Sequence, residues 1–227
     1  MPNATTIDFA RLRQTMVDCQ IRTFDVTDQL VLDRMNHVPR EMFVPPAMAS
    51  LAYSDGPLTM AAGAARRTML TPMVLARMLQ ALRLGPFDRV LDVAGGAGYS
   101  TAVMAGLAST VVALESDTSF AEAARSNLVQ GGIGNVTAVA GPLARGWPEA
   151  APFDAILVNG AVGSGLEALL DQLRDPGRLV CIESDGPPGA GQAVLYERMG
   201  GETGRRALFS CDAERLSEFA RRPTFAF

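Results

Sequence analysis

The chain has 227 residues, a formal net charge of −4, an isoelectric point near 5.1 and 48% hydrophobic residues. This length is enough for one domain with a substantial core, and the acidic balance argues against general nucleic-acid binding. Three widely spaced cysteines and a single histidine suggest neither a disulfide framework nor a metal site. No stretch resembles a membrane span or a signal peptide, so we expect a cytoplasmic protein that does not bind membranes.

The first part of the chain predicts two helices. Residues 8–19 have an amphipathic pattern, and residues 25–35 predict a second helix with Thr27 as its N-cap. Three apolar residues of the second helix are expected on one face: Leu30, Val31 and Met35. Pro39 ends this helix, and His37 is expected to cap or pack there rather than to catalyse.

Residues 54–70 contain glycine, proline and two arginines without steady periodicity, which predicts a long functional loop. Thr71 is expected to cap a helix that starts at Pro72 and ends at Gly85. From Arg89 onward, alternating strand-like and helical stretches predict a mostly parallel sheet with helices on both faces. The strand-like runs are 89–93, 110–114, 136–140, 154–158 and 178–183, then a terminal hairpin of 192–198 and 205–211. The helical stretches are 98–107, 117–129 and 165–174.

The stretch Arg89–Tyr99 (RVLDVAGGAGY) places a glycine-rich turn between a strand and a helix. Such a turn lets a ligand approach the backbone at the carboxyl end of a parallel strand. The dinucleotide fingerprint G-x-G-x-x-G fits poorly, because Thr101 stands in place of its last glycine. The pattern D-x-G-x-G-x-G of S-adenosylmethionine sites fits better, and its four positions hold Asp92, Ala94, Gly96 and Gly98.

An acidic residue follows at the end of the second strand-like run. Glu115 lies 23 residues after Asp92 (115 − 92 = 23), where a carboxylate accepts hydrogen bonds from both hydroxyls of a ribose. The alternative is that the glycines serve helix packing and that Glu115 is a solvated side chain. Strand, turn, helix, second strand and acid agree with one another, which favours a nucleoside-binding site.

Further motifs occur in the order typical of one known family. They are Met16-Val17 with Gln20-Ile21, Val38-Pro39-Arg40-Glu41 with Phe43-Val44-Pro45, Ala52-Tyr53-Ser54-Asp55-Gly56-Pro57-Leu58, and Pro152-Phe153-Asp154-Ala155-Ile156-Leu157-Val158. With residues 92–99 they resemble the protein-L-isoaspartate O-methyltransferases over approximately residues 16–198. The resemblance implies an α/β fold, the class I S-adenosylmethionine-dependent methyltransferase (Rossmann-like) sheet of seven mostly parallel strands, with added N-terminal helices.

The resemblance also implies a reaction. Members of this family transfer a methyl group from S-adenosyl-L-methionine to the α-carboxylate of an L-isoaspartyl residue in a damaged protein or peptide, leaving S-adenosyl-L-homocysteine. The ester then collapses to a succinimide that reopens partly to normal aspartate, which repairs the protein. Such chemistry needs little acid–base machinery, because the carboxylate is already anionic and the sulfonium carries its own leaving group; positioning and desolvation dominate.

The substrate loop departs from the family pattern G-Q-T-I-S-x-P. Thr68 matches the pattern, but Leu70 stands where the family has its active-site serine, and Thr71 follows directly. A leucine cannot hydrogen-bond an acceptor carboxylate. Arg66 and Arg67 are candidates to bind that carboxylate, with a solvated loop face as the equally weighted alternative.

The cofactor half implied by the resemblance comprises nine positions: Asp92, Ala94, Gly96, Gly98, Tyr99, Glu115, Gly141, Pro142 and Asn159. Ala94 adds a methyl group where the pattern has glycine. Pro142 removes a carboxylate and a backbone donor where the family has G-D-G. Asn159, at the tip of the strand over 154–158, is expected either to line the pocket or to shape a turn.

We therefore expect a single structural domain, with N-terminal helices and a substrate loop (1–70) packed on a methyltransferase core (71–227). The favoured function is carboxyl methylation of isoaspartyl proteins or peptides. Leu70 and the two arginines leave open a different, small anionic acceptor. The departures at Leu70, Ala94 and Pro142 leave open a cofactor-binding protein that no longer catalyses. The sequence decides neither the oligomeric state nor the role of the tail 221–227.

Overall fold

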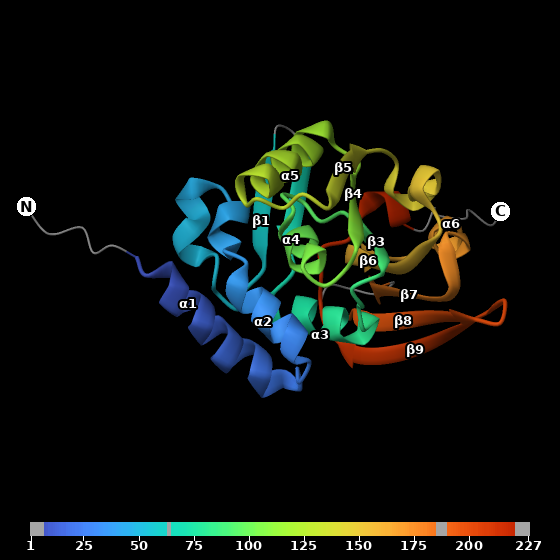
Figure 1. Cartoon of the computed structure of the whole chain (residues 1–227), viewed down its shortest axis with the longest axis horizontal. Coiled ribbons are helices and arrows are strands. Elements are labelled where there is room, and N and C mark those ends of the chain that lie inside the picture. The colour runs from blue at the N-terminus through green and yellow to red at the C-terminus, as the bar shows by residue number, and fades with distance from the viewer. Residues whose placement is uncertain (1–6, 63–64, 185–189, 221–227) are drawn as a thin grey trace, which may run out of the picture.

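The computed structural model describes residues 7–62, 65–184 and 190–220, and its centre is a seven-stranded sheet (Figure 1). The strand order is β5-β4-β3-β6-β7-β8-β9. The bounds are β3 (Arg89–Val93), β4 (Thr110–Glu115), β5 (Val136–Ala140), β6 (Phe153–Val162), β7 (Leu173–Glu183), β8 (Gln192–Met199) and β9 (Glu202–Ser210). The first five of these pair in parallel, and β8 and β9 pair antiparallel. The predicted sheet and terminal hairpin are confirmed.

Helices cover both faces of this sheet. The helices that follow the N-terminal region are α3 (Pro72–Leu82), α4 (Tyr99–Ala105), α5 (Thr118–Gln130) and α6 (Glu167–Asp171). Neighbouring residues of one strand face opposite sides, since Val90 packs in the core under α3, α4 and α5, and Leu91 packs in the core under α6. A strand buried on both faces needs a continuous apolar run, which is why these strands were readable from the sequence.

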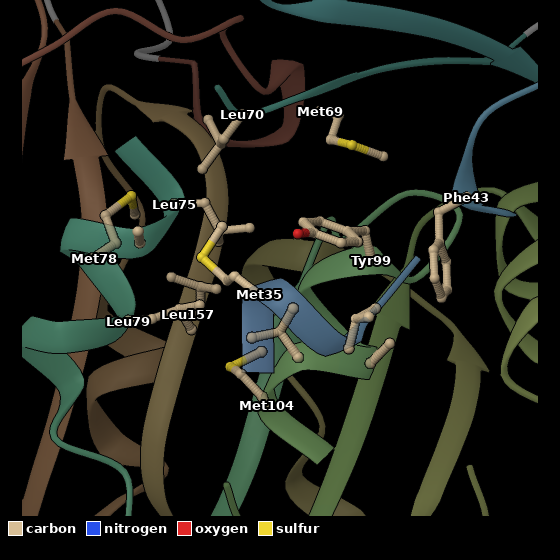
Figure 2. Close-up of a cluster of buried hydrophobic side chains, with 14 of the residues drawn as sticks. Met35, Phe43, Met69, Leu70, Leu75, Met78, Leu79, Tyr99, Met104 and Leu157 are labelled. Atoms are coloured by element: carbon tan, nitrogen blue, oxygen red, sulfur yellow. The ribbon is translucent and has the colours of Figure 1, made fainter. Parts of the chain in front are cut away.

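The N-terminal segment adds α1 (Phe9–Met16), a π-helical turn (Val17–Ile21) and α2 (Gln29–His37). Their buried side chains belong to the same hydrophobic core as α3 and α4, and Figure 2 shows Met35 of α2 close to Leu79 and Met104. The division at residue 70 stays a prediction. Within the described ranges, no helix combines the length and apolar character that a membrane crossing requires.

The N-cap of α2 is Asp28 and not Thr27, which corrects the sequence-based prediction. The Asp28 carboxylate accepts hydrogen bonds from the backbone N–H groups of Leu30 (2.9 Å) and Val31 (3.3 Å). The Thr27 N–H instead donates to the side chain of Gln80. The expected face also shifts: Leu30 is exposed, and the buried residues are Val31, Leu32 and Met35.

The predicted loop over 54–70 contains an antiparallel hairpin, so that prediction was wrong for residues 58–62 and 65–69. Strands β1 (Leu58–Ala62) and β2 (Ala65–Met69) pair, with Thr59 opposite Thr68 and Met60 opposite Arg67. Leu58 and Met60 are buried while Thr59 is exposed, an alternation too short to stand out among the surrounding glycines and prolines. This hairpin lies outside the seven-stranded sheet.

The position of the cap gives a direct test. We expect Asp28→Ala to lower the free energy of unfolding by about 1 kcal/mol, because two backbone N–H groups of α2 lose their acceptor. Thr27→Ala is the matched control and should change it by less than about 0.5 kcal/mol. Urea unfolding followed by circular dichroism measures both, and an equal loss in the two variants would contradict the assignment.

Candidate active site

The carboxyl ends of β3 and β4 lie side by side, and the glycine-rich loop leaves β3 at this edge. The backbone N–H of Ala94 donates to the carbonyl of Leu114 at 2.9 Å, which fixes the start of the loop. Three loop residues have left-handed φ values: Ala94 (+59°), Gly96 (+62°) and Gly98 (+98°). Ala94 thus adopts the left-handed conformation expected of the glycine in the pattern. Its Cβ makes this conformation sterically unfavourable.

Asp92 stabilises this loop through buried hydrogen bonds. Its carboxylate is fully buried and accepts hydrogen bonds from Ser100 Oγ (2.7 Å), Thr101 Oγ1 (2.5 Å) and Asn159 Nδ2 (2.6 Å). Burial raises the pKa of Asp92, and the three donors oppose that rise. A Cβ on Gly95 would lie 2.6 Å from this carboxylate, so only glycine fits there. Asp92 therefore joins β3, α4 and β6 around the loop.

Glu115, at the end of β4, is the acid next to the loop. The residue is 2% exposed, and Oε1 accepts the Gly96 N–H at 2.6 Å. Its Oε2 lies 3.0 Å from both Nε and Nη2 of Arg67. Burial raises the pKa of Glu115, and the charge of Arg67 acts in the opposite direction. The alternative of a solvated Glu115 is excluded, because the side chain is buried and paired.

Arg67 therefore lies elsewhere than expected. The sequence suggested that it binds an acceptor carboxylate or is solvated, whereas its side chain is 12% exposed and its guanidinium pairs with Glu115. It also donates to Ser116 Oγ at 2.7 Å. Arg66 precedes Arg67 on β2. Side chains alternate between the two faces of a strand, so Arg66 faces away from Glu115 and is exposed. The contact between Arg67 and Glu115 joins two segments 48 residues apart.

The β1–β2 hairpin covers the glycine loop and leaves a cavity of about 10 Å³ between them. Its walls bring together seven of the predicted site residues: Arg67, Thr68, Leu70, Ala94, Gly96, Tyr99 and Asn159. That volume is about one water molecule. This cavity is therefore too small for a nucleoside in the arrangement that the structure shows.

The predicted acceptor residues lie at the end of β2, beside a second, wider cavity of about 600 Å³. The Thr68 hydroxyl is 2.8 Å from that of Thr59 and also donates to the carboxylate of Glu214. Leu70 is buried, and Thr71 occupies the N-cap position of α3. The Thr71 side chain makes no capping hydrogen bond, so its predicted capping role is wrong in that respect.

A buried arginine, Arg40, was missed as a site residue. It is fully buried and donates from Nε to the carbonyl of Ala52 and from Nη2 to that of Leu70, each at 2.8 Å. Its guanidinium lies 4.6 Å from the centre of the Tyr99 ring, and burial lowers its pKa. Figure 2 shows Tyr99 between Phe43 and Leu75, below Leu70 and Met69. A charged residue within the apolar Val38–Val44 segment was the available signal.

Gly141 and Pro142 follow β5 next to the end of β4. The Gly141 N–H donates to the backbone carbonyl of Glu115 at 2.8 Å. A Cβ on Gly141 would lie 3.2 Å from the Trp147 ring, and Pro142 is exposed. Neither lines the 10 Å³ cavity, so the structure leaves their predicted role as a prediction.

The sheet order, the loop after β3 and the acid after β4 define the class I S-adenosylmethionine-dependent methyltransferase fold. Residues 11–196 match the family described as protein-L-isoaspartate(D-aspartate) O-methyltransferase. A protein-L-isoaspartate O-methyltransferase of Methylorubrum extorquens is 46% identical over 83% of this chain and 79% of its own length. Another, of Roseiflexus castenholzii, is 39% identical over 93% of this chain and 91% of its own. The chain therefore belongs to the protein-L-isoaspartate O-methyltransferase family.

Solved structures agree with the fold. A protein-L-isoaspartate O-methyltransferase superposes with a TM-score of 0.79 at 25% identity, covering 90% of this chain and 66% of that longer one. A structure from Plasmodium falciparum, described as a protein of this kind in complex with S-adenosyl-L-homocysteine, gives 0.77 at 21% identity over 91% of this chain and 98% of that chain. The expected fold class and family are confirmed.

The left-handed alanine gives a test of the loop. We expect Ala94→Gly to change the free energy of unfolding by less than about 0.5 kcal/mol, because relief of strain offsets the lost methyl contact and the extra unfolded-state entropy. Ala97→Gly, in the same loop without a left-handed φ, should cost about 1 kcal/mol or more. Equal losses by urea unfolding would contradict the strain at Ala94.

Proposed function

We propose that this protein methylates the α-carboxylate of L-isoaspartyl residues in damaged proteins and peptides, with S-adenosyl-L-methionine as methyl donor. The observation that carries the proposal is the meeting of Gly96, Glu115 and Thr68 at one edge of the sheet, in a chain whose relatives bear that name. Isoaspartyl proteins and peptides are then its partners. The cytoplasmic location expected from the sequence stays a prediction.

The residues at the edge of the sheet fit the nucleoside of the cofactor. Glu115 is a buried carboxylate already oriented by the Gly96 N–H, and a ribose offers two hydroxyls to such an acceptor. Gly96 has no side chain between its backbone and the hairpin, where a Cβ would lie 3.2 Å from Met60, so a ligand that enters between loop and hairpin can approach the backbone closely. Asn159 and Tyr99 lie on the adjoining wall. The bound cofactor supplies an electrophilic methyl group that carries its own leaving group.

Arg67 stands where the ribose is expected, because it occupies the free oxygen of Glu115. The nucleoside therefore replaces Arg67 at Glu115, and the hairpin that carries Arg67 moves with it. A buried carboxylate stays paired throughout, first with a guanidinium and then with hydroxyl donors. Exclusion of water from the closed site favours attack by an anionic acceptor.

On the acceptor side, Thr68 lines both cavities, and its hydroxyl donates to the Glu214 carboxylate, so it can donate to an acceptor carboxylate only after that bond is exchanged. Leu70 offers only its backbone carbonyl, which already accepts from Arg40. The protein thus orients the acceptor carboxylate with fewer hydrogen bonds than the family pattern supplies. Leu70 is the observation that favours the second candidate, a methyltransferase with another acceptor.

The proposal is tested with two peptides that differ only in isoaspartate against aspartate. Labelled S-adenosyl-L-methionine should transfer its methyl group to the isoaspartyl peptide and leave the aspartyl peptide unlabelled. Absence of label in both peptides, from protein that binds S-adenosyl-L-homocysteine in calorimetry, would reject isoaspartate as acceptor. Absence of cofactor binding as well would reject a methyltransferase.

The role of Glu115 is tested by calorimetric titration with S-adenosyl-L-homocysteine. Glu115→Ala should weaken binding by roughly 1–3 kcal/mol, because the ribose loses a charged acceptor. Glu122→Ala, an exposed acid on α5, is the control and should leave the affinity unchanged. Equal affinities in all three proteins would show that Glu115 serves the fold alone.

The missing serine is tested by a pair of substitutions. Leu70→Ser and Leu70→Ala open similar space, but only the serine adds a donor for the acceptor carboxylate. We expect kcat/KM on the isoaspartyl peptide to be about tenfold or more higher for the serine variant, since a hydrogen bond to a charged group contributes about 1.5–3 kcal/mol. Identical values for the two variants would mean that the acceptor binds away from residue 70.

A further inference from the structure

The wider cavity beside β2 is the entrance to the acceptor side. It shares Thr68, Met69 and Leu70 with the small cavity over the glycine loop, so the two cavities lie next to each other. Its floor is apolar, with Met73 and Val74 of α3 completing the wall. A volume of about 600 Å³ is in the range that holds several side chains of a peptide.

Carboxylates surround this cavity. Its lining includes Asp55, Asp212 and Glu214, all exposed, and contains no arginine or lysine among the residues that the structure describes. Arg66 on the hairpin and Arg215 beside Glu214 lie nearby in the chain, but neither lines the cavity. An approaching peptide therefore meets a negative potential at the entrance.

Glu214 is held in place by several contacts. Its carboxylate accepts the Thr68 hydroxyl, and its backbone carbonyl accepts the Ala161 N–H at 2.9 Å. The following residues are anchored by burial of Leu216 and Phe219. A Cβ on Gly160 would lie 2.7 Å from Leu216, so β6 is shaped to receive this segment. The acid is therefore fixed at the acceptor side.

The segment that carries Asp212 and Glu214 lies beyond residues 11–196, the part that matches the family. Two of the three acids, Asp212 and Glu214, therefore lie outside the matched part, and Asp55 lies within it. An isoaspartyl residue already brings one negative charge to this entrance. A second acid beside it adds repulsion, whereas a neighbouring cation adds attraction.

We propose that Glu214, together with Asp55 and Asp212, determines acceptor specificity by selecting isoaspartyl segments with a lysine or arginine side chain next to the isoaspartyl residue. This inference rests on the proposed function. The carboxylates act on the neighbouring side chain of the peptide, and the methyl transfer itself is unchanged. The preference therefore lies in KM more than in kcat.

The test uses isoaspartyl peptides that are identical except for one neighbour of the isoaspartyl residue, which is lysine, glutamine or glutamate. We expect KM to rise from the lysine to the glutamine to the glutamate peptide, by about fivefold at each step at low salt. At about 1 M salt, where charges are screened beyond about 3 Å, the three values should converge. A preference that salt does not reduce would overturn its electrostatic origin.

Substitutions at Glu214 and Asp212 test whether these two carboxylates cause the preference for a lysine neighbour. Glu214→Gln still accepts the Thr68 hydroxyl with its amide oxygen but loses the charge, and Asp212→Asn loses a second charge. The double variant should bring the three KM values to within about twofold of one another. Glu202→Gln, an exposed acid in β9, is the matched control and should retain the wild-type order.

The outcomes separate this inference from the proposed function. Methylation of all three peptides with equal KM would overturn the specificity and leave the isoaspartyl activity in place. An unchanged preference in the double variant would overturn the assignment to Asp212 and Glu214. Methylation of none of the peptides would reject the isoaspartyl activity and this inference with it.

Discussion

The buried carboxylate of Glu115 is the constraint on which the arrangement of the site depends. A charge that is 2% exposed needs partners, and the available ones come from two separate parts of the molecule. The Gly96 N–H fixes the glycine loop to one oxygen, and Arg67 fixes the β1–β2 hairpin to the other. One side chain thus holds the cofactor loop and the acceptor hairpin together.

Asp92, a second buried acid, differs from Glu115 in the kind of partners that its carboxylate has. Asp92 has three neutral donors from α4 and β6, and these elements belong to the core. Glu115 is balanced by a cation on a hairpin outside the main sheet. The partners of Asp92 therefore belong to the core, while the cation that pairs with Glu115 belongs to the hairpin. This difference supports the proposal that the first acid stabilises the loop and the second binds the ligand.

The sequence predicted what short-range patterns encode. Apolar runs bounded by glycine located β3 and β5 at their observed bounds, and the glycine turn with Glu115 located the site. The hairpin was missed because β1 and β2 lack a continuous apolar run: Thr59 interrupts the first strand, and Arg66, Arg67 and Thr68 occupy most of the second. The cap was predicted at Thr27, one residue before the observed Asp28, because threonine is a good cap. The bond from the Thr27 N–H to the Gln80 side chain, which spans 53 residues, could not be foreseen from the sequence.

The roles of Arg67 and Arg40 were out of reach for a related reason. Each depends on a partner that is far along the chain: Glu115 for the first, and Ala52 and Leu70 for the second. A sequence shows which side chains carry charge, and the fold decides which charge they meet. The resemblance to the family placed Arg67 in the substrate loop. It did not predict that the Arg67 side chain points toward Glu115.

The most direct test of this account is calorimetric titration of S-adenosyl-L-homocysteine into Arg67→Gln, with Arg66→Gln as the control. If the nucleoside replaces Arg67 at Glu115 as proposed, Arg67→Gln should bind roughly fivefold more tightly than the unmodified protein, the equivalent of an ion pair of about 1 kcal/mol that no longer has to be broken. Arg66→Gln should bind like the unmodified protein. Weaker binding by Arg67→Gln would contradict the account and would mean that Arg67 stays in place and holds the ligand.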